Sequence, residues 1–375
     1  MYILERIIGV TTFTLGTMIS FFFIYNSKSE NISKNINIYL CFISIIAYFY
    51  IPPIGEDLYR INLLMDSIKN ISFSKFCLET VFSSSYPLGM LMFYVVARIR
   101  LYGLLPLFTV FITYSNIFYI LKDSIKQNKL SSKNAAWVFL FCMSSGLYGY
   151  LVTNIRSLMA ISIAIKCIYN EIYNNKSILK DFVWYIIAIL IHPVAMLIFI
   201  FRLGYEIFTN KTSSKRYIKI LLIILVLTSI YLFKNRYVMI INKYINYKKN
   251  NDYFLIYDFT KFLLSNISII YIAQLANKYT LDNDVENQKV KKMSKFVVYL
   301  IILISVLGEY NIFVRISYFV CVLAIPLLTH IFNDKFKGKI SKTFELYIFL
   351  LIVFLLGISC TRGHLSSFKF LLLTS

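Results

Sequence analysis

Long apolar runs separated by short polar segments cover almost the whole chain. A bilayer core about 30 Å thick is crossed by about 20 helical residues, and twelve apolar runs of roughly that length are present. They cover residues 7–25, 36–52, 80–97, 104–121, 135–152, 157–173, 182–200, 217–233, 262–277, 296–309, 314–332 and 344–361. The pattern predicts an all-α protein, a polytopic transmembrane helical bundle of about 10–12 spans that forms one integral membrane domain over residues 1–375.

Three segments are open to more than one interpretation. The run 80–97 ends at Arg98 and Arg100, and it is either a span or a partly re-entrant or interfacial segment. The segments at about 53–79 and 234–261 are expected at the outer face, as loops or as segments lying in the membrane interface.

Basic segments between the runs predict the orientation. Lys and Arg collect in cytoplasmic loops. Three short cationic segments are separated from one another by even numbers of predicted spans, so they lie on the same side of the membrane, and we place them on the cytoplasmic side. They contain Arg202, Lys211, Lys215, Arg216 and Lys219; Lys278, Lys289, Lys291, Lys292 and Lys295; and Lys335, Lys337, Lys339 and Lys342. The loop with Lys122, Lys126, Lys129 and Lys133 is placed inside by the same rule, which leaves 234–261 outside.

The middle of the chain has one crossing too many for this orientation. Three runs, 135–152, 157–173 and 182–200, lie between two inside loops. One solution is a hairpin over 177–208 bent at His192-Pro193, because proline removes a helix hydrogen bond and disfavours helix at the preceding residue. The other is that 135–173 crosses only once. We favour the hairpin, which places His192 at the outer face.

The composition agrees with a membrane protein and excludes other classes. Of 375 residues, 58% are hydrophobic and 15% charged, whereas soluble domains are about 45–50% apolar and about 25% charged. A soluble globule this apolar would expose large patches, and disorder requires low hydrophobicity. The net charge of +21, from 39 basic and 18 acidic residues, reflects basic loops near lipid headgroups rather than nucleic-acid binding.

Motifs for cofactor chemistry are absent from the sequence. There is no Walker loop, GxGxxG, GxSxG or HExxH motif. We therefore expect neither a cofactor nor a metal, and ATP-driven transport and Rossmann-type chemistry are disfavoured.

Ionisable residues at the ends of the apolar runs are candidates for function, because an unpaired charge in hydrocarbon is costly. A guanidinium at a helix start, as at Arg156, suits a phosphate, although an arginine can also snorkel to the interface. The structural alternatives are a core position for His192, an ion pair between Glu309 and Arg315, and a solvated loop for Glu56 and Asp57. The candidates are Glu56, Asp57, Tyr59, Arg60, Arg98, Arg156, His192, Glu309 and Arg315.

The order and spacing of these elements resemble a known family. The acidic element reads Gly55-Glu56-Asp57-Leu58-Tyr59, the arginine element Arg156-Ser157-Leu158-Met159-Ala160, and the histidine element, about 35 residues later, Ile191-His192-Pro193-Val194-Ala195. Together with Arg315-Ile316-Ser317-Tyr318-Phe319, they resemble the EpsG-like members of the Wzy-type O-antigen and exopolysaccharide polymerases over about residues 50–330. Ser157 stands where that family often has Gln, and Glu56 before Asp57 leaves open which acid matters.

The resemblance implies a bacterial inner-membrane glycosyltransferase with a glycosyltransferase C-like architecture and no nucleotide sugar. Its donor would be a glycan on undecaprenyl diphosphate, its acceptor a repeat unit on a second lipid carrier, and its protein partner a chain-length-regulating co-polymerase. The predicted substrate- and diphosphate-binding residues are Arg156, Arg315, Arg60, Arg98, Tyr59 and Glu309. The predicted catalytic residues, which orient or deprotonate the acceptor hydroxyl, are His192, Asp57 and Glu56.

Two other functions are also compatible with the sequence. A lipid-linked oligosaccharide flippase, or another transporter, predicts charged groups across the membrane depth and pseudo-symmetric halves, whereas the candidates here cluster at the ends of runs. An O-antigen ligase would use the same lipid donor with a lipid A core acceptor. We favour the polymerase because the acidic element resembles that branch.

Overall fold

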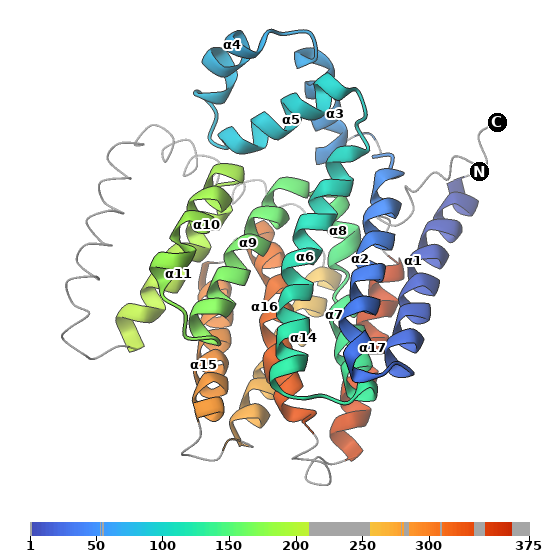
Figure 1. Ribbon diagram of the computed structural model, residues 1–375, viewed down its shortest axis with the longest axis vertical. Coiled ribbons are helices and arrows are strands. Elements are labelled where there is room, and N and C mark those ends of the chain that lie inside the picture. The colour runs from blue at the N-terminus through green and yellow to red at the C-terminus, as the bar shows by residue number, and fades with distance from the viewer. Residues whose placement is uncertain are drawn as a thin grey trace.

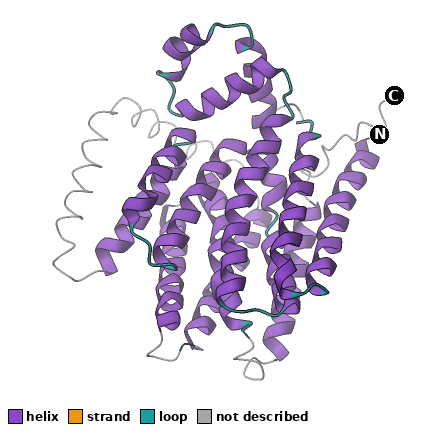
Figure 2. Ribbon diagram, in the orientation of Figure 1, coloured by secondary structure: helices purple, strands orange, loops and turns teal. Residues whose placement is uncertain are grey.

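The computed structural model describes residues 2–209 except 53 and 55, and residues 256–278, 280, 285–307, 310–333 and 342–361. Most of these residues are helical and none of them forms a β-strand (Figure 2), so the prediction of an all-α protein is confirmed. The predicted span 217–233, most of the segment 234–261, and Glu309 lie outside the described residues.

The longer helices lie side by side in a bundle (Figure 1). Helix α16 occupies its centre: every residue from 316 to 331 is buried, and the helix contacts α6, α7, α9, α14 and α15. A helix that is apolar all round is expected in such a position. The bundle helices are α1 (Tyr2–Tyr25), α2 (Ile32–Tyr48), α6 (Leu104–Gln127), α7 (Ser132–Ser144), α9 (Ile155–Ile172), α10 (Ile178–Ile191), α11 (Val194–Thr209), α14 (Ile256–Lys278), α15 (Val285–Leu307), α16 (Tyr310–Ile331) and α17 (Lys342–Thr361). A short helix, α8 (Leu147–Thr153), joins α7 to α9, and a 3₁₀ turn, η1 (Ser29–Asn31), joins α1 to α2.

Residues 57–99 form a helical layer across one end of the bundle, which we call the cap (Figure 1). It consists of α3 (Asp57–Ile68), α4 (Phe73–Phe76), the π-helical turn η2 (Cys77–Val81) and α5 (Pro87–Ile99). The buried side chains of α3 recur at helical spacing and face the α5 side: Leu58, Ile61, Met65 and Ile68. The Phe76 ring stacks on Tyr94 with ring centroids 4.5 Å apart, so the cap has a small apolar core of its own.

The cap changes the interpretation of two predicted segments. The apolar run 80–97 does not form a bundle helix, because α5 packs against α3 and has only 13 residues, fewer than the roughly 20 that a span requires. Residues 53–79 are mostly helical rather than an open loop. Part of the apolar character of both segments serves packing, within the cap and between α5 and α10, whereas Phe73, Leu78 and Phe82 are exposed.

The hairpin predicted for 177–208 is confirmed. Helix α10 ends at Ile191, α11 starts at Val194, and the break lies at His192-Pro193, as the missing amide hydrogen of proline requires. The alternative of a single crossing over 135–173 is wrong. The amide of Asn128, just after α6, donates to the hydroxyl of Tyr173, just after α9, at 3.2 Å, so the chain returns to the end of the bundle from which it started. Gly146, with φ of 75°, makes the turn between α7 and α8, and a left-handed backbone favours glycine there.

Several predicted basic segments lie at the end of the bundle opposite the cap. Lys292 Nζ donates to Asn175 Oδ1 at 2.8 Å, and Gln127 donates to Asn174 Oδ1 at 2.8 Å, which places the ends of α6 and α9 beside the start of α15. The cationic residues 289–295 lie in the first half of α15 and not in a loop.

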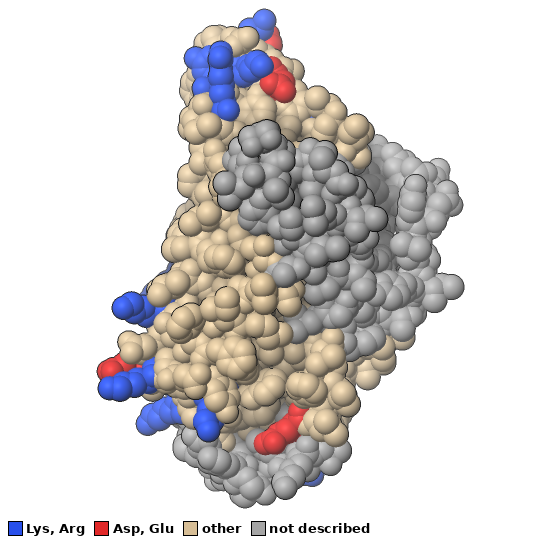
Figure 3. All heavy atoms as spheres, turned by 90° about the vertical axis from the view of Figure 1, so that its right-hand side faces the viewer, with Lys and Arg blue, Asp and Glu red and all other residues tan. Residues whose placement is uncertain are grey.

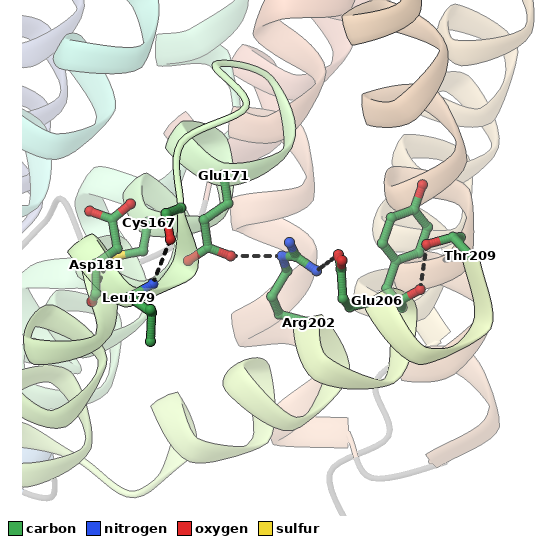
Figure 4. Close-up of polar contacts among 9 residues, drawn as sticks. Cys167, Glu171, Leu179, Asp181, Arg202, Glu206 and Thr209 are labelled. Carbon is green, nitrogen blue, oxygen red and sulfur yellow. Dashed lines mark hydrogen bonds and ion pairs between the residues drawn. The ribbon is translucent and has the colours of Figure 1, made fainter. Parts of the chain in front are cut away.

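Arg202 is a further departure from the predicted basic loops. It lies within α11 and is buried, its Nε donates to Glu171 Oε2 at 2.8 Å, and its Nη1 donates to Glu206 Oε2 at 3.0 Å (Figure 4). Glu171 belongs to α9, so this ion pair connects two bundle helices. The prediction of Arg202 as a cation of an inside loop is wrong, because its charge is matched by carboxylates inside the protein.

Apolar side chains are exposed on the outward faces of the outer helices. In the coloured part of the face in Figure 3, a band without acidic or basic side chains separates the charges of the cap from those of the opposite end. Two helices of the described region, Leu104–Gln127 and Ile312–Ile331, are long and apolar enough to cross a membrane. Exposed large apolar residues of the bundle include Leu15, Ile19 and Phe22 on α1, Val183 and Trp184 on α10, Ile267 on α14, Ile302 and Val306 on α15, and Leu350 on α17.

Candidate active site

Two oppositely charged residues meet where the cap covers the bundle. Asp57 is the first residue of α3, and an acid in the first helical turn interacts favourably with the helix dipole. Arg156 is the second residue of α9, where a cation is unfavourable by the same argument. The position of Arg156 therefore calls for an anion beside it.

Asp57 supplies that anion. The Nη2 atom of Arg156 donates to both carboxylate oxygens of Asp57, at 3.1 and 3.0 Å. The side chains are 16% exposed for Arg156 and 28% exposed for Asp57, so the pair is shielded but open to solvent. It joins residues 99 positions apart in the sequence.

Two aromatic rings, one just before α5 and one within it, lie close to the guanidinium of Arg156. Its Cζ lies 4.6 Å from the centroid of the Tyr86 ring and 5.6 Å from that of Phe93. Tyr86 precedes Pro87, which occupies the first turn of α5 as proline prefers. Phe93 follows seven positions later, two helical turns along and on the same face. The rings add cation–π attraction and limit the conformations of the arginine.

His192 lies next to the same stretch of α5. A Cβ atom at Gly89 would be 3.1 Å from the carbonyl oxygen of Ile191 and 3.8 Å from Cδ of Arg156. Gly89 thus allows α5 to approach the backbone before His192 closely, while Arg156 lies at ordinary contact distance. Val194 donates its backbone N–H to Nδ1 of His192 at 3.2 Å, and the imidazole is half-buried.

Arg315 lies in the second turn of α16, at the same end of the bundle, and is half-buried. One turn further on, the ring of Tyr318 stacks on Tyr150 of α8, with centroids 5.2 Å apart. Since α8 leads directly into α9, this contact places the start of α16 near the chain segment that carries Arg156.

The other predicted site residues differ in their relation to this centre. Glu56 precedes Asp57 but accepts a hydrogen bond from the Tyr50 hydroxyl at 2.5 Å. Tyr59 is half-buried and Arg60 is exposed on α3. Arg98 lies nine residues beyond Gly89, about 14 Å along α5.

Arg98 has its own contacts within the cap. Its Nη1 donates to the carbonyl oxygen of Lys69 at 3.1 Å, and its guanidinium lies 5.8 Å from the centroid of the Tyr94 ring. The structure therefore groups Asp57, Arg156 and His192, with Arg315 at the same end of the bundle. It does not bring Arg98 to that group.

Sequence reasoning missed Tyr86, Gly89, Phe93 and Tyr50. Pro87 followed by Gly89 indicates a helix start and a possible close approach, but no local signal shows that α5 approaches Arg156. These residues become recognisable only through contacts between segments far apart in the chain.

The arrangement can bind an oxyanion. A guanidinium has five N–H donors, and Asp57 engages only the Nη2 atom. Within the described residues, Nε of Arg156 is buried and has no hydrogen-bond partner. No group of three or more His, Cys, Asp or Glu side chains in the described part of the chain could hold a metal ion.

Comparison with known proteins gave one result. No curated protein and no solved structure matches the chain significantly. The sequence model of the EpsG family matches residues 100–372, a region that includes Arg156, His192 and Arg315 and follows the cap. The chain therefore belongs to the EpsG family.

Proposed function

We propose that the protein is a polysaccharide polymerase of the bacterial inner membrane. It transfers a growing glycan from undecaprenyl diphosphate onto a lipid-linked repeat unit at the outer face. Membership of the EpsG family supports a polymerase-like role. The observation that carries the proposal is the guanidinium of Arg156, which is fixed by Asp57, Tyr86 and Phe93 beside the His192 turn.

The same proposal treats the chain as one multi-pass membrane domain. The exposed apolar side chains on the outer helices would face lipid acyl chains. The lysine-rich end would face the cytoplasm, by the preference of basic residues for that side. The cap, with Asp57 and the rings of α5, would then lie at the outer face, where polymerisation takes place.

The proposed reaction is a displacement at the anomeric carbon of the donor. An oxygen–carbon bond forms from the acceptor hydroxyl, and the bond between the anomeric carbon and the diphosphate oxygen breaks, with its electron pair remaining on the diphosphate. Arg156 and Arg315 stabilise that charge through N–H donors. The hydroxyl proton passes to a carboxylate, for which Asp57 and Glu56 are the candidates. Because Arg156 also binds Asp57, a bound diphosphate would compete for the guanidinium and release the carboxylate.

Deletion of the gene tests the assignment. A strain without a polymerase should display single repeat units at its surface and no longer polymer. A strain without a flippase would display none, and one without a ligase would accumulate polymer on the lipid carrier. Either of the last two results would overturn the proposal.

Complementation with variants tests the site. We expect Arg156→Ala to reduce polymer by about a hundredfold, the usual effect of losing one donor to a developing oxyanion. Arg156→Lys should recover little, because an ammonium cannot reproduce the planar contacts of a guanidinium. Lys75→Ala, on the exposed surface of α4, is the control and should retain full activity. Polymer at wild-type level from a correctly inserted Arg156→Ala protein would exclude this site.

A further inference from the structure

The C-terminal end of α5 combines exposed cations with exposed apolar side chains. Arg98 and Arg100 are exposed, and the neighbouring Val95, Ile99 and Leu101 keep 55%, 51% and 48% of their surface accessible. We call these five residues the rim. Arginines among large aliphatic side chains are typical of a segment that lies in a membrane interface, where the charged groups reach the headgroups and the aliphatic groups reach the acyl chains.

A third cation connects the rim to α3. Arg98 Nη1 donates to the carbonyl oxygen of Lys69 at 3.1 Å, and the ammonium of Lys69 lies 2.9 Å from Asp66 Oδ1. Tyr102, which follows the rim, donates to the same carboxylate at 2.6 Å. This hydrogen bond raises the pKa of Tyr102, and the nearby charge of Arg100 opposes the effect. Three cations and one carboxylate thus lie at this end of the cap, which leaves it with an excess of positive charge.

The rim lies at the level where bundle helices end. A Cβ atom at Gly103, two residues after the rim, would overlap the carbonyl oxygen of Tyr48, the last residue of α2, and α6 begins at Leu104. Tyrosines such as Tyr48 and Tyr102 are enriched at this level of membrane proteins. Figure 3 shows basic side chains gathered on one side of the cap, above the band without charges. In the membrane placement proposed above, the band faces acyl chains, and the rim therefore lies in the outer headgroup layer.

We propose that the rim docks on anionic phospholipids of the outer leaflet, with its arginines on the lipid phosphates and Ile99 and Leu101 among the upper acyl chains. The charge favours this partner, because a guanidinium forms paired hydrogen bonds with a phosphate and cations near a membrane are attracted to anionic headgroups. A docked rim holds α5, which carries the Phe93 ring beside Arg156, so anionic lipid should steady the cap over the candidate site. This inference rests on the membrane placement in the proposed function.

Tryptophan fluorescence tests the depth of the rim. Ile99→Trp is made in a chain whose two native tryptophans are replaced (Trp137→Phe, Trp184→Phe), and it is placed in nanodiscs of lipids brominated on the upper acyl chain, which quench a nearby indole. We expect strong quenching, and the same for Leu101→Trp. The control is Leu78→Trp, at an exposed position just after α4, on the side of the cap away from the bundle (Figure 1). It should be quenched by iodide in the buffer and not by the brominated lipid.

Arg100 allows one charge to be removed without changing the backbone. Its φ of 61° is left-handed, a conformation in which Asn is enriched, so Arg100→Asn keeps the backbone and Arg100→Lys keeps the charge. The measurement is hydrogen-exchange protection of α5 in phosphatidylcholine nanodiscs with increasing phosphatidylglycerol. Protection of wild type and Arg100→Lys should rise with the anionic fraction. Arg100→Asn should need about fivefold more anionic lipid for the same protection, the effect of one cation at a membrane surface. Lys75→Ala, on α4, is the control and should match wild type.

The outcomes separate this inference from the proposed function, and none of the measurements requires polymer formation. Trp184 is exposed on α10 and is the reference for the bundle in a chain with Trp137→Phe. An unquenched Trp184 in brominated lipid would refute the membrane placement itself. A quenched Trp184 with an unquenched Ile99→Trp would refute the docked rim.

The lipid titration has its own contradicting results. An equal dependence on phosphatidylglycerol for Arg100→Asn and wild type would refute the role of the charge. Protection that rises with added undecaprenyl diphosphate in neutral lipid, and not with phosphatidylglycerol, would assign the arginines to the substrate and overturn the proposal.

Discussion

At the scale of single residues, the guanidinium of Arg156 is the best-defined group of the candidate site. A carboxylate accepts hydrogen bonds from one of its nitrogens, and two aromatic rings lie within cation–π distance of the guanidinium. An arginine has several rotatable bonds, and fixing it costs side-chain entropy. Contacts that fix it before substrate arrives reduce that cost at binding.

Tyr86 should act as a positioning residue through Arg156. Tyr86→Leu removes a cation–π contact worth about 0.5–2 kcal/mol. We therefore expect polymer formation to fall by about tenfold, since each 1.4 kcal/mol corresponds to that factor. Tyr86→Phe keeps the ring and should restore activity. The measurement is the polymerisation rate of both variants at equal amounts of inserted protein; equal rates would contradict the positioning role.

At the scale of helices, the connection between α9 and α11 depends on a buried ion pair. Arg202 lies between Glu171 and Glu206, and the Glu171 carboxyl group is fully buried (Figure 4). Such a pair contributes little net stability compared with apolar residues, but the loss of one partner leaves an uncompensated charge in the interior. The hairpin that presents His192 is thus attached to α9 at the opposite end of the bundle.

Arg202→Met should destabilise the protein by about 3–5 kcal/mol, because it leaves Glu171 buried without its cation. The double variant Arg202→Met, Glu171→Leu should recover much of this loss. Lys69→Ala, which breaks an exposed pair with Asp66, is the control and should change the stability far less. Unfolding of the purified variants in detergent provides the measurement, and additive effects of the two core substitutions would contradict the coupling.

At the scale of the whole molecule, the proposed function requires the cap to remain on the bundle. Asp57 connects α3 to α9, and the hydroxyl of Tyr102, just before α6, donates to Asp66 of α3 at 2.6 Å. Together with a hydrogen bond from Lys69, the Tyr102 bond holds the pKa of Asp66 below its usual value. The ionised carboxylate is therefore the form that attaches the cap.

This attachment should weaken in acid. A carboxyl group whose pKa is lowered by folding contributes stability above its unfolded pKa, and this contribution is lost as the pH falls through the folded pKa. For an aspartate the loss begins at roughly pH 4 and continues below it. We expect the protection of residues 57–99 against amide hydrogen exchange to fall in that range, after correction for the pH dependence of the intrinsic exchange rate.

Asp66→Asn is the matched variant for that measurement. It should already show faster exchange in the cap at neutral pH and a smaller change on acidification. The exchange rate of the cap in Tyr102→Phe should lie between those of Asp66→Asn and wild type, because the hydrogen bond from Lys69 to Asp66 remains. An identical pH dependence for Asp66→Asn and wild type would mean that this carboxylate does not hold the cap.

Local patterns in the sequence were sufficient to predict the helical class, most helix positions, the break at His192-Pro193 and the appearance of Arg156 at a helix start. Hydrophobic periodicity and the missing amide hydrogen of proline act over a few residues, so their effects can be recognised locally. The resemblance to the EpsG family was also carried by short local motifs and is confirmed over residues 100–372.

The cap, the burial of Arg202 and the composition of the site became visible only in the folded protein. The apolar run 80–97 has the composition of a span, and its packing against α3 depends on a partner helix that periodicity does not specify. The contacts of Arg156 with Asp57, Tyr86 and Phe93 join segments about 60 to 100 residues apart. Such contacts arise from the free energy of the whole packed chain, and no local pattern records them.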